Sequence, residues 1–553
     1  MGAHPKGLGR QRHERGNAVV NDIVRLVKPD ICILGYAMFL AVNATGIWGG
    51  VFLFLPMEIQ TADVMFWFYL AQSVMLFAVF FTVGLSTFFS RRMNLRPSLR
   101  VIISAGVYFT GWAFLIGAMY LDAWVRLLAV FGGLFLGVGA ALFYLLWQRL
   151  FAGGGEESGM RDLILAFMYS AVFYAALYLV PRAVTAYLIP LVFLPLFALA
   201  LIIGSRRIDY GQPMFADEPH ENLRVYRAAL TSMWRGAVSM GALAFCTGIM
   251  RALAVEQPEI GSTVNILSMA ALFASALVVL LFWQFKGVHM NLIKLFRIMF
   301  PVLISAFFLL PFLGAAYSRW LAALLYALYS IGLLLMSIQC AQTARDRGVN
   351  PSFVFGVYGG IVYGLHDLGF IVGSVTDMVQ VPGMEQLTFT AVLAMYLLAI
   401  MFFVSVVDFR DTAHQLFYGD TIELVAPRRK PAPAAAPVPA VAAEGAHAVV
   451  PGAGDGTQRR PAGPAQTKRT RSDDGQVYRD RIDKQVALAR EAYGLSMREA
   501  EVVSLIMRGN TVARIAELLF ISENTVRTHT KRIYAKLDVH KKAELIALVE
   551  EAR

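Results

Sequence analysis

The pattern of apolar and polar positions divides the chain near residue 408. Before this point long apolar stretches alternate with short polar loops, whereas residues 410–553 have the mixed composition of soluble proteins. A helix needs about 20 apolar residues to cross the hydrocarbon core of a bilayer. The stretches therefore predict twelve membrane-spanning helices, at 31–55, 64–89, 101–120, 127–148, 162–180, 184–204, 233–250, 264–283, 298–316, 320–341, 353–375 and 387–407.

Basic residues in the loops predict how these helices are oriented, because cytoplasmic loops are enriched in Lys and Arg. With the N-terminus inside, the exterior loops hold Arg126, Arg182, Arg251 and Arg319. The interior loops hold a larger set: Arg91, Arg92, Arg96, Arg100, Arg149, Arg161, Arg206, Arg207, Arg224, Arg227, Lys286, Lys294, Arg297, Arg345 and Arg347. We predict a multi-pass protein of the cytoplasmic (inner) membrane with both termini in the cytoplasm.

The layout of these spans resembles the major facilitator superfamily. That superfamily arranges twelve helices as six plus six, and here a longer polar loop, 205–232, follows the sixth span. The segment from Gly84 to Arg92 keeps the glycine and the arginines of the superfamily's loop motif but lacks its acidic residue. The resemblance implies a secondary transporter, and the missing acid counts against transport.

Ionisable residues are scarce within the predicted spans. His366 and Asp367, in the eleventh, are candidates for ligand binding or proton coupling, because a charge inside a membrane is costly. An interior polar contact that fixes helix packing is the alternative interpretation. Cys32, Cys246 and Cys340 lie in apolar stretches without metal-site spacing, so we expect no metal site and no disulfide.

Two segments outside the spans are predicted to lack a core. Residues 1–30 form a basic cytoplasmic N-terminus, and residues 408–475 are dominated by Ala, Pro and Gly. The part of the second segment from Pro427 to about Asp474 is expected to be a disordered tether of about 50 residues with a reach of about 40 Å. Arg428, Arg429 and Lys430 near its start are candidates for contact with anionic lipid, or for a solvated charge cluster.

Residues 495–553 predict four short helices. The sequence from Ser496 to Glu499 has the form of a capping box, and Gly509 is placed to end the first helix. Thr511 caps the second helix and Ser522 the third. The third helix buries a stripe at helical spacing, formed by Val526, Thr530, Ile533 and Leu537. The whole chain is therefore expected to be all-α.

The opposite face of the third helix is polar and basic. It holds Asn524, Arg527, Thr528, Lys531, Arg532 and Lys536. Basic and hydroxyl side chains on the second helix of a helix-turn-helix are typical of DNA reading in the major groove. A basic face alone is usually only a solvated surface, but here it coincides with that frame.

The segment from Leu495 to Val549 resembles the LuxR/FixJ-type helix-turn-helix family. The shared residues include Arg498-Glu499, Gly509, Ile515-Ala516, Ile521-Ser522, Thr525-Val526 and Lys536-Leu537. The resemblance implies that Arg527, Thr528 and Lys531 face bases. It implies phosphate contacts for Asn524, Thr525 and Lys536, with help from Thr511. Arg514 departs from the acid often found there.

A connecting helix, 476–494, precedes this domain. Tyr478, Ile482, Val486, Ala489 and Tyr493 recur at helical spacing. This stripe either packs on the domain or pairs with a second copy of the chain. The resemblance also implies a homodimer on DNA, formed through the last helix.

Two functions are compatible with these features. The first is a membrane-bound one-component transcriptional regulator whose membrane domain senses an unknown signal, either a small-molecule ligand or a state of the membrane. The alternative is a secondary transporter with a regulatory DNA-binding tail. A passive anchor would need far fewer spans. We expect promoter DNA, membrane lipid and RNA polymerase as partners. The sequence contains no P-loop, dinucleotide loop or nucleophile elbow, so we expect no enzyme and no cofactor.

Overall fold

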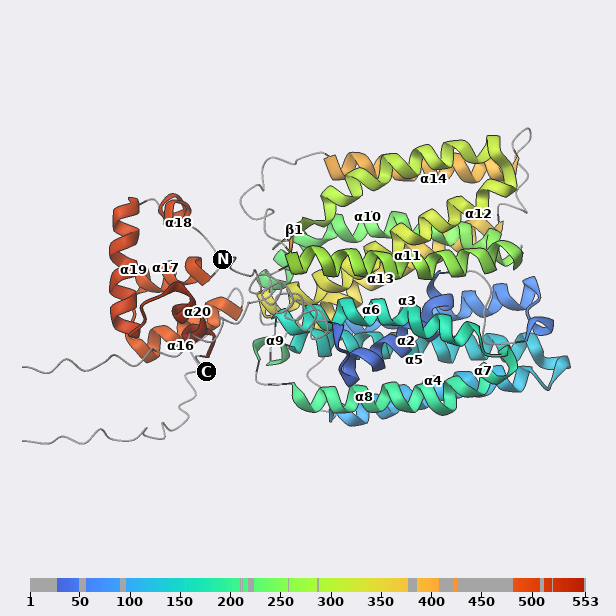
Figure 1. Ribbon diagram of the computed structural model, residues 1–553, viewed down its shortest axis with the longest axis horizontal. Coiled ribbons are helices and arrows are strands. Elements are labelled where there is room, and N and C mark those ends of the chain that lie inside the picture. The colour runs from blue at the N-terminus through green and yellow to red at the C-terminus, as the bar shows by residue number, and fades with distance from the viewer. Residues whose placement is uncertain are drawn as a thin grey trace, which may run out of the picture. The chain divides into compact units, whose positions relative to one another are not determined.

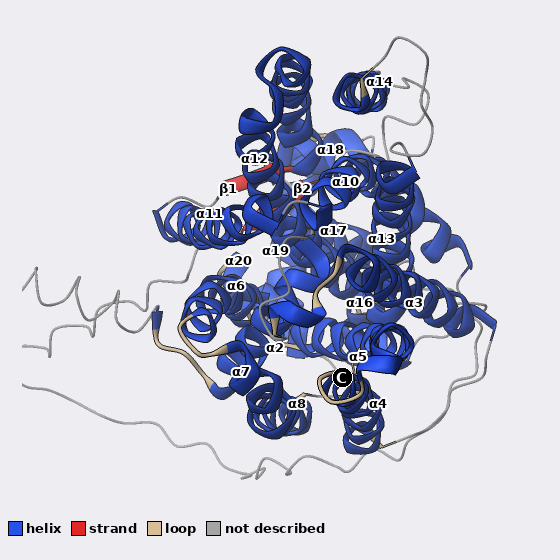
Figure 2. Ribbon diagram, turned by 90° about the vertical axis from the view of Figure 1, so that its right-hand side faces the viewer, coloured by secondary structure: helices blue, strands red, loops and turns tan. Residues whose placement is uncertain are grey.

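A computed structural model describes residues 27–48, 56–89, 96–154, 156–208, 210, 212–216, 223–256, 258–285, 288–375, 385–406, 421–424, 481–507, 512–519 and 521–551. We name residues 31–406 the membrane body and residues 481–551 the C-terminal domain. Long helices make up the membrane body and lie side by side, as Figures 1 and 2 show from two directions.

The elements of the membrane body follow from its long apolar runs, in which only helices satisfy every backbone polar group without water. They are α2 (Ile31–Trp48), η1 (Met57–Ile59), α3 (Ala62–Phe89), α4 (Pro97–Ala118), η2 (Asp122–Trp124), α5 (Val125–Gly153), α6 (Glu156–Tyr178), α7 (Arg182–Leu188), η3 (Ile189–Phe193), α8 (Leu194–Arg207), α9 (Pro213–Ala216), α10 (Leu223–Glu256), α11 (Pro258–Phe285), α12 (Leu292–Arg347), α13 (Pro351–Val375) and α14 (Gln386–Val406).

Ten helical segments within the described residues are long and apolar enough to cross a membrane. Of the two remaining predicted spans, 233–250 lies in α10, whereas 31–55 lies in α2 only as far as Trp48, and residues 49–55 are outside the described part of the chain. The described apolar part of α2, Ile31–Asn43, is shorter than a span. Helix α10 is long but carries Arg227, Arg235 and Arg251. A multi-pass membrane body is therefore established, and the count of twelve stays a prediction.

Two helical runs of the membrane body are interrupted. Gly314 has a φ of +64°, a conformation that glycine adopts without penalty, and it divides α12 into two halves. The predicted ninth and tenth spans lie in these halves. Between α7 and α8, the π-helical turn η3 contains Pro190, which has no amide hydrogen to offer a regular helix.

Helices α10 and α13 pack backbone to backbone through glycines. A Cβ atom built on Gly248 would clash with the carbonyl oxygen of His366, and one on Gly369 would clash with the carbonyl oxygen of Phe245. A Cβ on Gly373 would lie 2.9 Å from the Cβ of Ala252. Small residues allow such close approach of helices in membranes, where dispersion contacts replace the hydrophobic effect.

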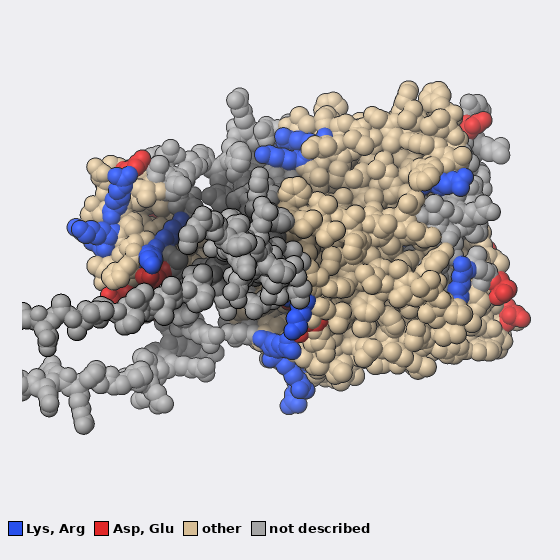
Figure 3. Space-filling view, viewed as in Figure 1, with Lys and Arg blue, Asp and Glu red and all other residues tan. Residues whose placement is uncertain are grey.

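The surface of the membrane body fits a lipid environment. Figure 3 shows a broad uncharged band along its side, with Lys, Arg, Asp and Glu gathered near the two ends. Large apolar side chains are exposed on the membrane body, among them Ile298, Phe312, Tyr396 and Phe403. In water such a surface would drive aggregation, whereas hydrocarbon solvates it.

The all-α prediction is confirmed for the described residues apart from one short ladder. Strands β1 (Val288–Asn291) and β2 (Thr421–Leu424) pair antiparallel, with Val288 opposite Leu424. In the chain, β1 comes after α11 and β2 comes after α14. Each strand therefore lies beyond the apolar run that favours the preceding helix. The rest of the predicted tether, 408–475, lies outside the described residues, as does most of the predicted N-terminal segment, 1–30.

The C-terminal domain has its own hydrophobic core. It consists of α16 (Arg481–Tyr493), α17 (Met497–Met507), α18 (Val512–Leu519), α19 (Glu523–Leu537) and α20 (Lys542–Glu551), drawn in red in Figure 1. Val502, Val503, Val526, Ile533 and Val549 are buried at its centre. The four helices predicted from the sequence are present, with α16 as the fifth.

Candidate nucleic-acid interface

Helix α19 is fixed at its N-terminus and along one face. The hydroxyl oxygen of Ser522 accepts a hydrogen bond from the backbone N–H of Thr525 at 3.1 Å, so the predicted cap is confirmed. Val526, Ile533 and Leu537 are buried on one side of the helix. The Thr530 hydroxyl donates to the carbonyl oxygen of Val526, so this part-buried residue of the predicted stripe satisfies its own polar group.

The opposite face of α19 is open to solvent. Asn524, Thr525, Arg527, Thr528 and Lys531 are all exposed, so these five predicted DNA-binding residues share one accessible surface. Arg527 donates to the carboxylate of Glu523 at 3.1 Å, one helical turn earlier, while its side chain stays 65% exposed. That ion pair is weak at such exposure, so the guanidinium can exchange it for a DNA acceptor.

The hydroxyl groups of this face are partly committed within the helix. Thr528 Oγ1 donates to the carbonyl oxygen of Asn524 at 2.9 Å, and Thr525 Oγ1 lies 2.8 Å from Ser522 Oγ. The oxygen atoms keep acceptor capacity after these bonds. Thr528 can therefore accept from a base edge more readily than it can donate to one.

Lys536 takes part in a contact that the sequence did not predict. Its Nζ donates to Glu499 Oε2 at 2.7 Å and to the carbonyl oxygen of Gly494 at 3.0 Å. These bonds link the end of α19 to the start of α17 and to the turn before it. The ammonium group of Lys536, which is predicted to bind a phosphate, thus already donates hydrogen bonds to two groups of its own domain.

Glu499 joins this contact to the capping box. The backbone N–H of Ser496 donates to Glu499 Oε2 at 2.8 Å, and the N–H of Glu499 donates to Ser496 Oγ at 3.3 Å. These reciprocal bonds confirm the predicted capping box. The hydrogen bond from Lys536 lowers the pKa of Glu499 to about 2, and the bonds from Ser496 act in the same direction. Glu499 is therefore a buried, ionised carboxylate at neutral pH.

A second contact holds α18 against α17. Arg498 donates to Glu501 Oε2 at 2.6 Å and to the carbonyl oxygen of Leu519 at 2.7 Å. The second bond satisfies a carbonyl at the C-terminal end of α18, where no amide follows within the helix. Thr511, predicted to assist DNA binding, lies outside the described residues.

Helix α16 belongs to the C-terminal domain. Val486 and Ala489 are buried in the same core as α17 and α19, and α16 packs against α17 and α20. Of the two alternatives for this stripe, packing on the domain is therefore correct at these positions. Tyr493 remains 40% exposed, and Tyr478 lies outside the described residues.

In the membrane body, the structure places a buried cation near the predicted pair His366 and Asp367. The ring nitrogen Nδ1 of His366 lies 3.6 Å from Asp367 Oδ1, and both side chains are almost fully buried on α13. The side chain of Arg251, on α10, is 1% exposed. Its guanidinium carbon lies 3.9 Å from the centre of the Tyr69 ring and 5.5 Å from that of Phe370.

The prediction that Arg251 lies in an exterior loop is wrong. The predicted seventh span ends at Met250, but apolar residues resume at Ala252–Val255, and α10 continues to Glu256 with the Arg251 side chain inside the bundle. Aromatic rings of α3 and α13 cover the guanidinium and offset part of the cost of its burial. A search for an arginine at the edge of a span could have found it.

Comparisons with known proteins agree with the geometry of the C-terminal domain. Residues 494–549 match the model of the family described as bacterial regulatory proteins, luxR family. The chain is 47% identical over 58 residues to a transcriptional regulator of Pseudomonas aeruginosa, covering 10% of this chain and 28% of that protein. It is 48% identical over 52 residues to the uncharacterized response regulatory protein YgeK of Escherichia coli K12, covering 9% of this chain and 35% of that protein.

The transcriptional regulatory protein NarL of Mycobacterium tuberculosis is 42% identical over 53 residues, 10% of this chain and 24% of NarL. The chain thus spans about a quarter to a third of the length of these curated relatives. The C-terminal domain is a LuxR-type helix-turn-helix domain of the kind found in transcriptional regulators. In this chain it follows a multi-pass membrane body.

The membrane body is similar to two solved transporters. The Escherichia coli fucose:proton symporter FucP is similar with a TM-score of 0.44 and 14% identity, covering 68% of this chain and 96% of FucP. The human organic anion transporter MFSD10 is similar with a TM-score of 0.44 and 13% identity, covering 69% of this chain and 99% of MFSD10.

Proposed function

We propose that this protein is a membrane-bound one-component transcriptional regulator, in which the membrane body senses a signal and the C-terminal domain binds promoter DNA. The observation that carries the proposal is the presence, in one chain, of a match to the luxR family at 494–549 and, among the described residues, of ten apolar helical segments long enough to cross a membrane. The proposal assigns no enzymatic reaction and no cofactor to the chain.

The proposed DNA contacts use the exposed face of α19. Arg527, Thr528 and Lys531 are assigned to base edges, while Asn524 and Thr525, beside the capped N-terminus, are assigned to phosphates. The positive end of a helix dipole favours phosphate at that place. Lys536 is assigned a supporting role, because its ammonium already binds Glu499. We further propose that the protein binds DNA as a homodimer and contacts RNA polymerase.

The proposed sensor is the buried group of Arg251, His366 and Asp367. Among the described residues, Nε and Nη2 of Arg251, both ring nitrogens of His366 and both carboxylate oxygens of Asp367 have no hydrogen-bond partner. Buried polar atoms without partners are costly and are retained where function needs them. A ligand that satisfies them in one conformation of the body would shift the population of that conformation.

The same buried group favours a second candidate, a secondary transporter with a regulatory DNA-binding tail. Charged side chains inside a bundle are also what solute or proton coupling requires. The two candidates differ in whether the membrane body moves a solute across the membrane. A regulator needs no such transport, whereas a transporter should lose solute uptake when Asp367→Asn removes the charge.

The deciding experiment starts from a strain in which the gene is deleted, and compares transcription and chromatin occupancy in four strains made from it. They express the full-length chain, the Arg527→Ala/Lys531→Ala variant, the Arg251→Gln variant and the control Arg319→Gln, whose side chain is exposed. The regulator proposal expects occupied promoters upstream of genes whose expression changes on deletion. The Arg527→Ala/Lys531→Ala variant should no longer occupy these promoters. The Arg251→Gln variant should be present at the wild-type level but should no longer change the expression of these genes, and the Arg319→Gln control should behave as the wild type. Occupancy that survives in the first variant contradicts the proposal.

Orientation is tested separately. We propose that both termini lie in the cytoplasm, because the C-terminal domain must reach DNA. Alkaline phosphatase, which is active only outside the cytoplasm, is fused after residue 182 or after residue 553. Activity is expected at the first position and not at the second. The reverse result would place the C-terminal domain away from DNA.

A further inference from the structure

One buried arginine joins two parts of the membrane body that are far apart in the chain. We call α2 to α8 the first half of the body and α10 to α14 the second half. The sequence places Arg345 in the loop after the tenth predicted span, but the structure keeps it in α12, where it is 4% exposed. Its Nε donates to the carbonyl oxygen of Ala152 at 3.2 Å, and its Nη2 donates to that of Phe151 at 3.0 Å. Both acceptors belong to α5, in the first half.

These two hydrogen bonds complete the C-terminal end of α5. The last four carbonyl groups of a helix have no amide partner within it. In α5 the carbonyl oxygen of Leu150 accepts from the backbone N–H of Gly154, and that of Gly153 accepts from Gln212 at 3.1 Å. Arg345 supplies the donors for the other two. Its positive charge also opposes the partial negative charge at this end of the helix dipole.

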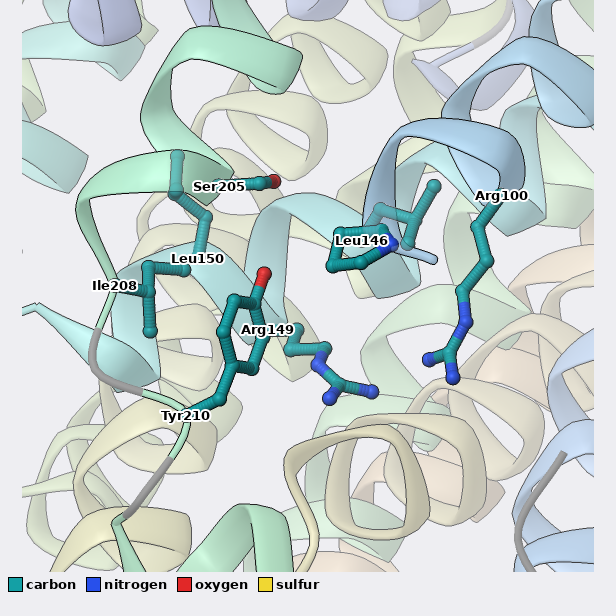
Figure 4. Close-up of a pocket in the computed structure, with 8 residues that line it drawn as sticks. Arg100, Leu146, Arg149, Leu150, Ser205, Ile208 and Tyr210 are labelled. Atoms are coloured by element: carbon teal, nitrogen blue, oxygen red, sulfur yellow. The ribbon is translucent and has the colours of Figure 1, made fainter. Parts of the chain in front are cut away.

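Within the first half, the end of α5 is fixed by other contacts. Figure 4 shows Arg149, in the last turns of α5, beside the ring of Tyr210, which follows α8. The guanidinium carbon of Arg149 lies 5.5 Å from the centre of that ring and 4.9 Å from the centre of the Phe215 ring. Cation–π contacts thus attach α5 to the segment after α8. Arg345 therefore binds a part of the first half that is itself held by its neighbours.

The contact between Arg345 and α5 is close-packed. A Cβ atom built on Gly159, in α6, would lie 2.6 Å from the carbonyl oxygen of Phe151 and 3.2 Å from Nη2 of Arg345. A buried guanidinium or carbonyl group that loses its partner is costly unless water takes the partner's place. The contact is therefore either made and dry, or broken and hydrated.

A second contact joins the two halves at the same end of the body. Near the end of α3 and the start of α13, Gly84 and Gly356 meet backbone to backbone, since a Cβ on Gly356 would lie 2.8 Å from the carbonyl oxygen of Phe80. Helix α13 begins only a few residues after α12 ends, so both contacts lie where the chain turns between these helices. The glycine contact depends on close packing, whereas breaking the arginine contact also requires water.

We propose that Arg345 is a clamp that keeps the membrane body closed at the end where α5 and α12 end, and that its release from Phe151 and Ala152 opens the body there. Opening separates the two halves and brings water to the guanidinium group and to both carbonyl groups. The conformation in this structure is the closed form at this end. The clamp belongs to the membrane body alone, so it applies to a sensor and to a transporter alike and does not rest on DNA binding.

The test measures whether water reaches the contact in the full-length protein in detergent. Ala341 lies one helical turn before Arg345, on the same face of α12, and is 8% exposed. Ala341→Cys, combined with Cys340→Ala, supplies a reporter thiol at this place. A water-soluble maleimide reacts with the thiolate form of cysteine, so the labelling rate reports hydration. Peptide mass spectrometry assigns the label to the reporter thiol or to a native cysteine.

Cys32 is the internal control for local loss of structure. It is buried near the start of α2, and its Sγ atom lies 3.9 Å from the carbonyl oxygen of Ala200 on α8. Both helices belong to the first half, so separation of the halves leaves Cys32 protected. Unravelling of the first half would expose it.

The variants on the reporter background are Arg345→Gln, Arg345→Lys and the control Arg206→Gln, an exposed arginine at the end of α8. Gln removes the charge, whereas Lys keeps the charge but lacks the fork that serves two carbonyl groups. We expect the reporter thiol to be labelled at least five times faster in Arg345→Gln than in the background and at an intermediate rate in Arg345→Lys. Cys32 should react at the background rate in both, and the control should behave as the background does.

An unchanged labelling rate of the reporter thiol in Arg345→Gln overturns the proposal. An equal rise at Cys32 also overturns it, because the arginine would then only support the local fold. The thermal unfolding temperature reports whether each variant folds. If Arg345→Gln does not fold, Arg345→Lys decides by the same two criteria.

Discussion

Lys536 and Glu499 form an ion pair of 2.7 Å that joins the end of α19 to the start of α17 across 37 positions of sequence. The carboxylate is almost fully buried, while the lysine is 40% exposed. Because Glu499 also accepts from the backbone of Ser496, one side chain both begins α17 and positions α19. Glu499 thus caps α17 and, through Lys536, also holds α19 in place.

Breaking this pair is expected to destabilise the C-terminal domain rather than to remove a DNA contact. Lys536→Gln leaves the Glu499 carboxylate buried without its cation, which costs about 2 kcal/mol of unfolding free energy. Urea unfolding of a 472–553 fragment measures the change. Lys531→Gln, an exposed position on the same helix, serves as the matched control and should alter stability by less than about 0.5 kcal/mol.

The pair also predicts how stability depends on pH. The pKa of Glu499 is lowered to about 2 by Lys536, so its contribution is complete above the unfolded pKa near 4.5 and declines as pH falls toward 2. Unfolding free energy measured between pH 6 and pH 2 should therefore fall across this window. The fall should be smaller in Glu499→Gln, which starts from a lower stability. Parallel pH profiles for the two proteins would contradict the assignment.

DNA reading is expected to depend on Arg527 and Lys531 together. Their replacement by Ala in the 472–553 fragment removes the discrimination between a target promoter and unrelated DNA, about 1–3 kcal/mol for each base contact. The slope of log affinity against log salt should change little, because these two side chains are assigned to base edges and not to phosphates. Footprinting and a salt titration measure both effects. A footprint unchanged from the wild type would remove this face from the interface.

The glycine contact between α10 and α13 gives a prediction for the membrane body. Gly369→Val adds atoms where a Cβ alone already meets the carbonyl oxygen of Phe245, so the helices must separate. The full-length protein in detergent should lose several degrees of thermal stability. Gly106→Ala, on α4, is the matched control, because a Cβ there meets no atom within 4 Å. Equal thermal stability of the two variants would argue against a tight interface.

The features that were predicted correctly from the sequence depend on residues that are close to one another in the chain. Both N-terminal caps, at Ser496 and Ser522, and the buried stripe of α19 depend on contacts within four positions, and all are present. The partners of Lys536 and Arg251 lie on other helices, so no local pattern records them. For the same reason the sequence placed His366 and Asp367 in a span but did not supply the cation that faces them.

The backbone contact between α10 and α13 also limits how the membrane body can move. Arg251 lies on one of these helices and His366 and Asp367 on the other. With glycines at Gly248 and Gly369 seated against opposing carbonyl groups, neither helix can slide along the other without lifting away. We therefore expect α10 and α13 to move together as one rigid unit, so that Arg251 keeps its position relative to His366 and Asp367.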